Sequence, residues 1–351
     1  MTLGIIDVGT NTIHLLIGVL GLNGKFHVIL KERDLTRLGE GGLVRNRLAG
    51  ASMRRALEVL RRYADVMRRC GVDHIEAVAT SAVREAANGR DFVRRVRRQT
   101  AIPLRIVSGR EEARLIYLGV LQVHQFRRST LIISIGGGST QVMVGDANRA
   151  HYLVSVQLGG ARLNQRFIRH DPPLAEEVAD LYGYVRRVWA PVVRALRGHR
   201  WQQVFGSSAT IYQLSMAAYL QTHRRPPQGK MPLWLSQQAL RRLTARLERT
   251  TAAQRIQMPG VDPRRQDMVL PTGAALLTLM ESCGVSRLRY APGSLREGLV
   301  LDYLRRHHER QPRRFDEPAT DLLLNQVGND LALPWRKQLL KQLRKTNGAH
   351  P

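Results

Sequence analysis

The chain has 351 residues, of which 55 are Lys or Arg and 28 are Asp or Glu, so its formal net charge is +27. Hydrophobic residues make up 43% of the chain, which excludes disorder along its whole length and, at about 100–200 residues per domain, predicts two domains. The only two cysteines, Cys70 and Cys283, exclude a disulfide scaffold and a cysteine-based zinc cluster, and they favour a reducing compartment.

Strand and helix patterns alternate along the first 124 residues. Met53, Leu57 and Leu60 recur at helical spacing with Arg on the other face, which predicts a helix over residues 50–69. Ser108 follows a strand and is expected to cap a helix over residues 110–121. The other elements expected here are strands over residues 26–31, 75–79 and 103–107 and a helix over residues 91–98.

The second half follows the same plan, which predicts an α/β fold with mixed sheets. Pro191 is expected to cut a long amphipathic helix over residues 174–196, because proline removes a helical hydrogen bond. The other expected elements are strands over residues 147–157, 203–205 and 287–290 and helices over residues 209–220, 263–281 and 294–305. Loops are expected over residues 222–232 and 311–318, and a basic amphipathic helix over residues 334–345.

The sequence contains an internal repeat. Residues 5–18 align without a gap on residues 132–145, and each copy is an apolar run, a polar stretch with Gly, and a second apolar run. This pattern predicts a β-hairpin in each copy and therefore two similar domains. The predicted units are a first domain over residues 1–124, a second over residues 125–310 and a basic tail over residues 311–351. The last helix, residues 294–307, is expected to pack back on the first domain.

Three turns rich in Gly, Ser and Thr have the composition of phosphate-binding sites. Backbone N–H groups and hydroxyls converge at such a turn, and the absent side chains let an anion approach closely. The third turn also precedes a helix, whose N-terminal dipole attracts anions. The candidate phosphate ligands are Gly9, Thr10, Asn11 and Thr12 in the first hairpin, Gly136, Gly137, Gly138, Ser139 and Thr140 in the second, and Gly206, Ser207 and Ser208 in the third turn.

Charged residues lie close to these turns. Asp7 ends the first strand, where a carboxylate can hold Mg²⁺ against a substrate phosphate or, alternatively, stabilise the turn. Arg84 follows another strand, in a segment whose hydroxyls serve equally well as a helix cap, and it is a further candidate phosphate ligand. Glu111 and Glu112 open a helix, where Glu is commonly a capping residue.

The basic excess consists mainly of Arg. Six of the 55 cations are Lys, at positions 25, 31, 230, 337, 341 and 345. The Arg guanidinium binds phosphate oxygens with a planar fork, which favours a polyanionic partner such as nucleic acid, polyphosphate or an anionic membrane. A codon bias toward Arg, with scattered solvated charges, explains the composition equally well.

The sequence predicts no membrane-spanning segment, because no run reaches 18 uninterrupted apolar residues. Residues 1–20 are apolar, but they lack a basic leader and contain Asp7, Asn11 and His14, which argues against a signal peptide. We therefore expect a cytoplasmic protein.

Eight segments between Gly4 and Tyr303 resemble, in order, the exopolyphosphatase / guanosine pentaphosphate phosphohydrolase family. They are IIDVGTNTIHLLI, ATSAVREA, VSGREEARLIYLGV, IGGGSTQVMVG, VQLGGARLNQRF, GSSATI, MPGVDPRRQDMVLPTGAALL and GSLREGL. The resemblance implies the fold of the actin-like ATPases: duplicated, ribonuclease H-like domains that face each other across a cleft holding the active site.

The resemblance also implies a reaction, the hydrolysis of a phosphoanhydride bond with the help of Mg²⁺ or Mn²⁺. Members of the family release the terminal phosphate of inorganic polyphosphate or the 5′ γ-phosphate of guanosine pentaphosphate. Glu112 matches the family's catalytic carboxylate, which activates water, and Asp7 matches the first carboxylate of the metal site. The three Gly-rich turns match the phosphate-binding loops.

The sequence departs from the family pattern at three places. Ser134 stands where the family has a metal-binding Asp, so we expect Ser134 to be a weak metal ligand. Ala209 replaces a Gly of the third loop, and its methyl group crowds the approach of an anion. Few residues follow Tyr303, so we expect a short form without the helical C-terminal domain of longer members.

Three functions compete. An exopolyphosphatase-like hydrolase is favoured, because the +27 charge suits a long polyanion. Guanosine pentaphosphate is the alternative substrate. Aromatic residues are only 5% of the chain, however, and no aromatic cluster indicates a guanine pocket. A polyphosphate-binding regulatory protein with weakened catalysis is motivated by Ser134. A nucleic-acid-binding protein is supported by charge alone and is least favoured. Oligomeric state stays open, with a homodimer as one option.

Overall fold

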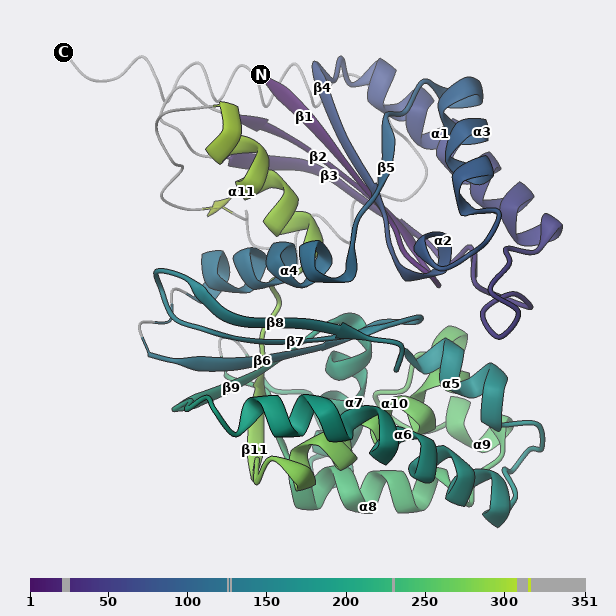
Figure 1. Ribbon diagram of the computed structural model, residues 1–351, viewed down its shortest axis with the longest axis vertical. Helices are drawn as coiled ribbons and strands as arrows, with labels where there is room; N and C mark the ends of the chain where they lie inside the picture. Colours follow the sequence, from purple (N-terminus) through teal and green to yellow (C-terminus); the bar gives the residue numbers. More distant parts are fainter. Residues whose placement is uncertain (21–25, 125, 127, 229–230, 308–314, 317–351) are drawn as a thin grey trace.

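The computed structural model describes residues 1–20, 26–124, 126, 128–228, 231–307 and 315–316. It contains two six-stranded mixed sheets with helices between and around them (Figure 1). The first sheet has the order β12-β3-β2-β1-β4-β5 and the second the order β10-β11-β9-β6-β7-β8. The strands are β1 (Thr2–Val8), β2 (Ile13–Leu20), β3 (Phe26–Asp34), β4 (His74–Ala79), β5 (Leu104–Ile106), β6 (Thr130–Ile135), β7 (Thr140–Gly145), β8 (Ala150–Val156), β9 (Gln203–Ser207), β10 (Trp234–Ser236), β11 (Arg287–Tyr290) and β12 (Phe315–Asp316).

Five strands of each sheet share one topology, and the sixth strands differ, since β12 pairs with β3 and β10 pairs with β11. In the first sheet, β1, β2 and β3 form an antiparallel meander, and β4 and β5 add in parallel beside β1. In the second sheet, β6, β7 and β8 form the same meander, and β9 and β11 add in parallel beside β6. This repeated strand order confirms the predicted duplicated actin-like fold.

The repeat in the sequence is also a repeat in strand register. Val8 pairs with Ile13 across the first hairpin, and Ile135 pairs with Thr140 across the second. The two turns therefore span residues 9–12 and 136–139, at equivalent positions of the gapless alignment.

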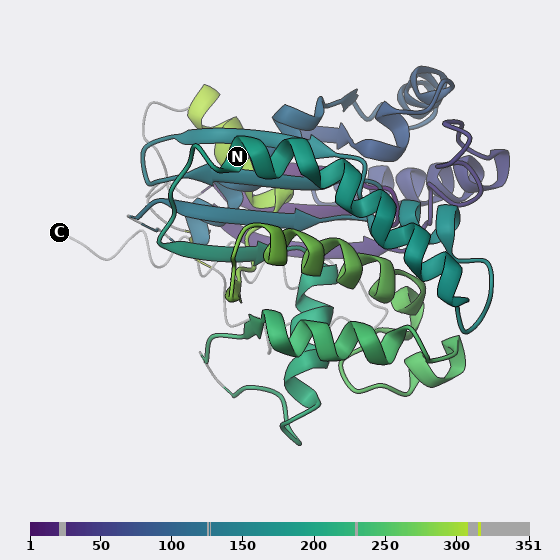
Figure 2. The same ribbon diagram turned by 60° about the horizontal axis from the view of Figure 1, so that its bottom comes forward.

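Three apolar clusters hold the sheets and helices together. The first joins the first sheet to α1 (Gly50–Arg69) and α3 (Gly89–Thr100). The second joins the second sheet to helices that include α6 (Ala175–Leu196), α8 (Gln237–Leu247) and α10 (Gln266–Ser282). Figure 2 shows α6 and α10 lying across the outer face of this sheet. The third lies between the sheets, where α4 (Gly109–His124) and α11 (Leu295–His307) are placed (Figure 1). The remaining helices are α2 (Ser81–Arg84), α5 (Gly160–Phe167), α7 (Ala209–Leu220), α9 (Ala252–Ile256) and the 3₁₀ turn η1 (Pro263–Arg265).

Most of the predicted elements form near their expected bounds, and α1, α7 and β11 have the predicted bounds. Ser108 caps α4 as predicted, because its hydroxyl accepts a hydrogen bond from the Glu111 amide at 3.1 Å. The sequence patterns do not predict α2, α5, α8, α9 or β10, and β12 lies in the segment 311–318 that was expected to be a loop.

The predicted cut at Pro191 was wrong, since α6 runs through this residue. Trp189, Val192 and Leu196 are buried in the second cluster on either side of it. The Trp189 indole also donates a hydrogen bond to the Ala275 carbonyl at 2.9 Å. This packing outweighs the one helical hydrogen bond that proline removes.

The predicted boundary after residue 124 coincides with the end of α4, and the division into two domains and a tail stays a prediction. Of the predicted tail, the structure describes β12, which pairs with β3 at the edge of the first sheet. The helix predicted over residues 334–345 lies outside the described residues. No helix within the described ranges combines the length and apolarity that a bilayer crossing needs.

The backbones of α4 and α11 come into direct contact. A Cβ atom on Gly298 would lie 1.8 Å from the Leu115 carbonyl oxygen, and one on Gly119 would lie 2.0 Å from the Ser294 carbonyl oxygen. Atoms do not approach so closely, so both positions require glycine. This contact holds α11, which follows the last strands of the second sheet, against the first half of the chain.

Gly298→Ala should therefore destabilise the protein by about 3 kcal/mol, at the upper end of the range for overpacked sites. Chemical denaturation of the variant and the wild type measures the difference. Gly183→Ala is the matched control, because Gly183 lies inside α6 with open space around it. It should stabilise the protein by about 0.5–1 kcal/mol, and equal effects of the two substitutions would contradict the packing argument.

Candidate functional site

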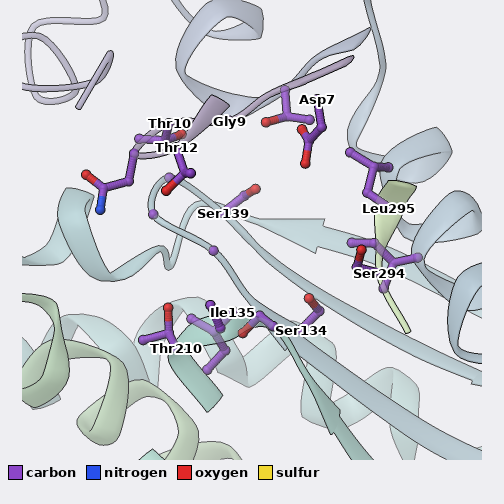
Figure 3. Close-up of a pocket in the computed structure, with 18 of the residues that line it drawn as sticks. Asp7, Gly9, Thr10, Thr12, Ser134, Ile135, Ser139, Thr210, Ser294 and Leu295 are labelled. Carbon is purple, nitrogen blue, oxygen red and sulfur yellow. The ribbon is translucent and has the colours of Figure 1, made fainter. Parts of the chain in front are cut away.

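A pocket of about 180 Å³ lies between the two halves. Its walls are the turns after β1, β6 and β9, together with residues from α4, α10 and α11. Figure 3 shows Asp7 and the first turn on one side of the pocket, Ser134 and Thr210 on the other, and Ser139 between them. The predicted site residues that line it are Asp7, Gly9, Thr10, Asn11, Thr12, Glu112, Ser134, Gly136, Gly137, Gly138, Ser139, Ser207 and Ser208.

Three predicted phosphate ligands are not among the lining residues. The Thr140 hydroxyl donates a hydrogen bond to the Leu158 carbonyl at 2.7 Å, so it holds the second turn instead. Gly206 lies behind the third turn, close to Ile211 and Leu288. Arg84 donates a hydrogen bond to Glu112 at 2.7 Å, which places its guanidinium on the candidate catalytic carboxylate.

The first and second turns touch each other. A Cβ atom on Gly138 would lie 2.4 Å from the Thr10 hydroxyl and 2.5 Å from the Ser81 hydroxyl. A Cβ atom on Gly137 would lie 3.3 Å from both Thr10 and Asn11. Glycine at these positions lets the two turns close around a single small volume, where the N–H groups of both can reach the same anion.

The third turn has a conformation that is unusual for its residue type. Ser208 has φ = +106°, which glycine adopts freely and L-residues rarely do. Its side chain caps α7 by accepting a hydrogen bond from the Ile211 amide at 3.3 Å. Backbone strain of this kind persists where the surroundings enforce it, commonly at functional sites, and here it directs the start of α7 toward the pocket.

Burial dominates the electrostatics of Asp7. It raises the pKa of the carboxyl from 3.8 to about 7, although Arg296 opposes the rise; the negative charges of Glu112 and Glu297 add to it. A nearby cation would remove the cost of ionising this group. Asp7 thus has the character of a metal ligand.

Glu112 lies at the start of α4 and is buried. Burial raises its pKa, and the charge and hydrogen bond of Arg84 act in the opposite direction. The nearby Ser139 hydroxyl of the second turn also lowers the pKa of Glu112. The candidate base is therefore bound by Arg84 of the first half and lies close to a hydroxyl of the second half.

The sequence motifs did not single out the three basic side chains among the described lining residues of the pocket, Arg265, Arg296 and His14. Arg265 is buried and donates a hydrogen bond to the Thr12 hydroxyl at 2.7 Å, while its Nε has no partner among the described residues. Arg296 lies 3.2 Å from Nδ1 of His14. Burial and the charges of Arg296, Arg265 and Arg33 hold the pKa of His14 well below its usual value, so this ring is neutral and accepts the Arg296 hydrogen bond. Both arginines belong to quoted family segments, which was the available signal.

The two hairpins contribute different charges to the pocket. Asp7 pairs with His14 across the first hairpin, and at the equivalent position of the second hairpin Ser134 pairs with Gln141. Among the described lining residues, Asp7 and Glu112 are the only carboxylates, and the described residues contain no cluster of three or more His, Cys, Asp or Glu side chains. Mg²⁺ commonly uses one or two carboxylates, waters and substrate phosphates, and this donor set fits that pattern.

Comparison with known proteins identifies the family. The model of the Ppx/GppA phosphatase family matches residues 21–307. The chain belongs to this family. It is 28% identical over 303 residues to Exopolyphosphatase 1 of Mycobacterium bovis, an alignment that covers 86% of this chain and 88% of the relative.

Solved structures of family members share the fold. The exopolyphosphatase from Cytophaga hutchinsonii is 29% identical with a TM-score of 0.79, over 87% of this chain and 97% of that one. The Ppx/GppA family member of Aquifex aeolicus is 23% identical with a TM-score of 0.72, over 88% of this chain and 99% of that one. The predicted family is thus confirmed.

The pocket collects residues from almost every segment that carries the family resemblance. Seven of the eight segments supply at least one lining residue. The exception is VQLGGARLNQRF, which ends β8 and forms α5 behind the second turn.

Asp7→Asn should raise the melting temperature at pH 8 by a few degrees when no divalent cation is present. The pKa of Asp7 is higher in the folded state (about 7) than in the unfolded chain (about 3.8), so the folded state binds this proton more tightly and loses stability as the pH rises from about 4 to 7. At pH 5 the gain should be much smaller. Thermal unfolding at both pH values measures it.

Added Mg²⁺ should stabilise the wild type at pH 8 and should have little effect on Asp7→Asn. Asp91→Asn, which removes an exposed carboxylate from α3, controls for the loss of one charge. A destabilised Asp7→Asn variant at pH 8 would show that the ionised carboxylate has a favourable partner.

Proposed function

We propose that this member of the Ppx/GppA family is an exopolyphosphatase-like hydrolase, which releases the terminal phosphate of inorganic polyphosphate by attack of a water molecule activated by Glu112. The position of Glu112 carries the proposal: it is buried, bound to Arg84, and open to the same pocket as Ser139 and the three Gly-rich turns. The names of the M. bovis and C. hutchinsonii relatives, both exopolyphosphatases, support the same activity.

In this reaction the Glu112 carboxylate accepts a proton from water while the water oxygen forms a bond to the terminal phosphorus. The bond from phosphorus to the bridging oxygen breaks, and the shortened chain keeps the electron pair. The negative charge is stabilised by the N–H groups of the turns and by Arg265 and Arg296, which line the pocket. Donors already in place need no reorganisation during the reaction.

Glu112 must be ionised to accept a proton. Because burial favours the protonated form, the carboxylate depends on the guanidinium of Arg84 at 2.7 Å. Arg84 is therefore assigned to Glu112 here and not to the substrate.

A divalent cation, Mg²⁺ or Mn²⁺, completes the proposed site, held by the Asp7 carboxylate and more weakly by the Ser134 hydroxyl. When bound, it neutralises charge on the phosphates and orients them. Asp7 fits this role because the ionisation of its buried carboxyl requires a nearby positive charge. The neutral Ser134 gives the second half less affinity for the ion.

Two alternatives remain. Guanosine pentaphosphate presents a terminal phosphate of the same kind, and the discriminating observation is the net charge of +27, which favours the longer polyanion. A polyphosphate-binding regulatory protein is favoured by the second hairpin, where the uncharged pair Ser134 and Gln141 takes the position that Asp7 and His14 have in the first hairpin. Phosphate release from both substrates, with Mg²⁺ or Mn²⁺, separates these cases: binding without release selects the regulatory protein.

Glu112→Gln should lower the turnover of polyphosphate by about 10²–10⁴-fold, which is the usual contribution of general-base catalysis, while polyphosphate binding is retained. The matched control is Glu111→Gln on the same turn of α4. Glu111 pairs with Arg114 and is absent from the pocket lining, so its variant should keep near-normal turnover. Near-normal turnover in Glu112→Gln would refute the role of the base.

Ser134→Asp should lower the Mg²⁺ concentration that gives half-maximal phosphate release, because an anionic oxygen replaces a neutral one at the metal site. Mg²⁺ titrations of both proteins at a fixed polyphosphate concentration measure the change. Unchanged or weaker dependence on Mg²⁺ in the variant would show that Ser134 does not limit metal binding.

A further inference from the structure

Four charged side chains form a continuous series from the second half of the protein into the first. Arg162 of α5 donates a hydrogen bond to Glu85, which directly follows α2. Arg84 donates to Glu85 at 3.3 Å and to Glu112 at 2.7 Å. The side chains are 7%, 14%, 17% and 9% exposed in the order Arg162, Glu85, Arg84 and Glu112. Solvent therefore screens these charges weakly.

Arg162 is held by contacts in both halves. Its Nε donates to the Gly138 carbonyl of the second turn at 2.9 Å, and Nη1 donates to the Leu43 carbonyl of the first half at 3.0 Å. The remaining nitrogen, Nη2, donates a hydrogen bond to Glu85. Because the guanidinium is planar and rigid, these three contacts determine where Glu85 lies relative to the second turn.

The contacts of Glu85 decide how Arg84 is shared. One Glu85 oxygen accepts from Arg162, and the other accepts from Ser81 at 3.0 Å and from Arg84. Without Arg162, the Glu85 carboxylate would retain Arg84 as its cation and would draw it from Glu112. The uncompensated charge of Glu85 would also repel Glu112 more strongly.

We propose that Arg162 is a positioning residue for Glu112: through Glu85, it keeps Arg84 on Glu112 and so keeps this carboxylate ionised beside the second turn. The proposal rests on the proposed function, since it takes Glu112 as the group that acts on water. It gives a role to VQLGGARLNQRF, the one family segment that supplies no lining residue. It also makes the base in the first half dependent on contact with the second half.

Other charged groups lie near this series and are common to all the variants below. Asp7 on β1 faces Glu112, while Arg296 and Glu297 on α11 and His14 on β2 surround Asp7. Ser155 of β8 lies beside Gly109 at the start of α4 and accepts a hydrogen bond from Gln141 of β7, and both side chains are uncharged. Differences between variants of Arg162 and Glu85 therefore report on the series itself.

The test is the pH dependence of kcat/KM for polyphosphate at saturating Mg²⁺. Arg162→Gln should move the acidic limb to higher pH by about one pH unit, which corresponds to about a tenfold loss below the limb and a smaller loss above it. Glu85→Gln should move the limb to lower pH, because it removes the repulsion of Glu112. The double variant, which loses one charge of each sign, should return toward the wild type.

Opposite shifts identify the electrostatic role, since damage to the fold lowers activity at every pH. Limbs that stay in place, or that move in the same direction in both single variants, would overturn the proposal. If Arg162→Gln does not fold, Glu85→Gln alone decides. An acidic limb of the kcat/KM profile that stays at the wild-type pH in Glu85→Gln also overturns the proposal. Undiminished turnover in Glu112→Gln would instead refute the proposed function, and this outcome is independent of Arg162.

Discussion

The contact between the two hairpin turns is the constraint on which the site depends. Gly138 meets Thr10 and Ser81 with no space for a side chain, and a Cβ atom on Gly159 would lie 2.3 Å from Gly138 in turn. Three backbone segments are therefore stacked where two sheets end. Only this proximity lets the donors of one half and the carboxylates of the other act on one phosphate.

The duplicated halves keep the same backbone and differ in chemistry. The first supplies both carboxylates of the pocket, and the second supplies the Gly-rich turn, uncharged side chains and the buried Arg265. Two halves with the same backbone can thus take different parts in the proposed reaction. The first half accepts the proton, and the second half stabilises negative charge. The series of charged side chains from Arg162 to Glu112 connects the two halves.

The sequence predicted what depends on local pattern. The hairpins repeat without a gap and the turns follow apolar strands, so two similar α/β halves and the phosphate turns could be predicted from pattern. The actin-like fold was implied by the family resemblance. Arg265 and Arg296 could not be separated from the many other arginines, because their burial beside the turns arises from long-range packing. Arg84 was assigned to the phosphate, and only coordinates reveal its bond to Glu112. The course of α6 through Pro191 likewise depends on distant contacts.

The position of α11 affects the order in which this chain can fold during synthesis. The inner face of the first sheet, which includes Leu3, Ile5 and Leu16, shares its apolar cluster with Leu299 and Leu304. These strands are synthesised well before α11, the helix that completes their cover. A growing chain thus exposes an apolar sheet face until α11 has been made, which is the kind of surface that chaperones bind and that leads to aggregation.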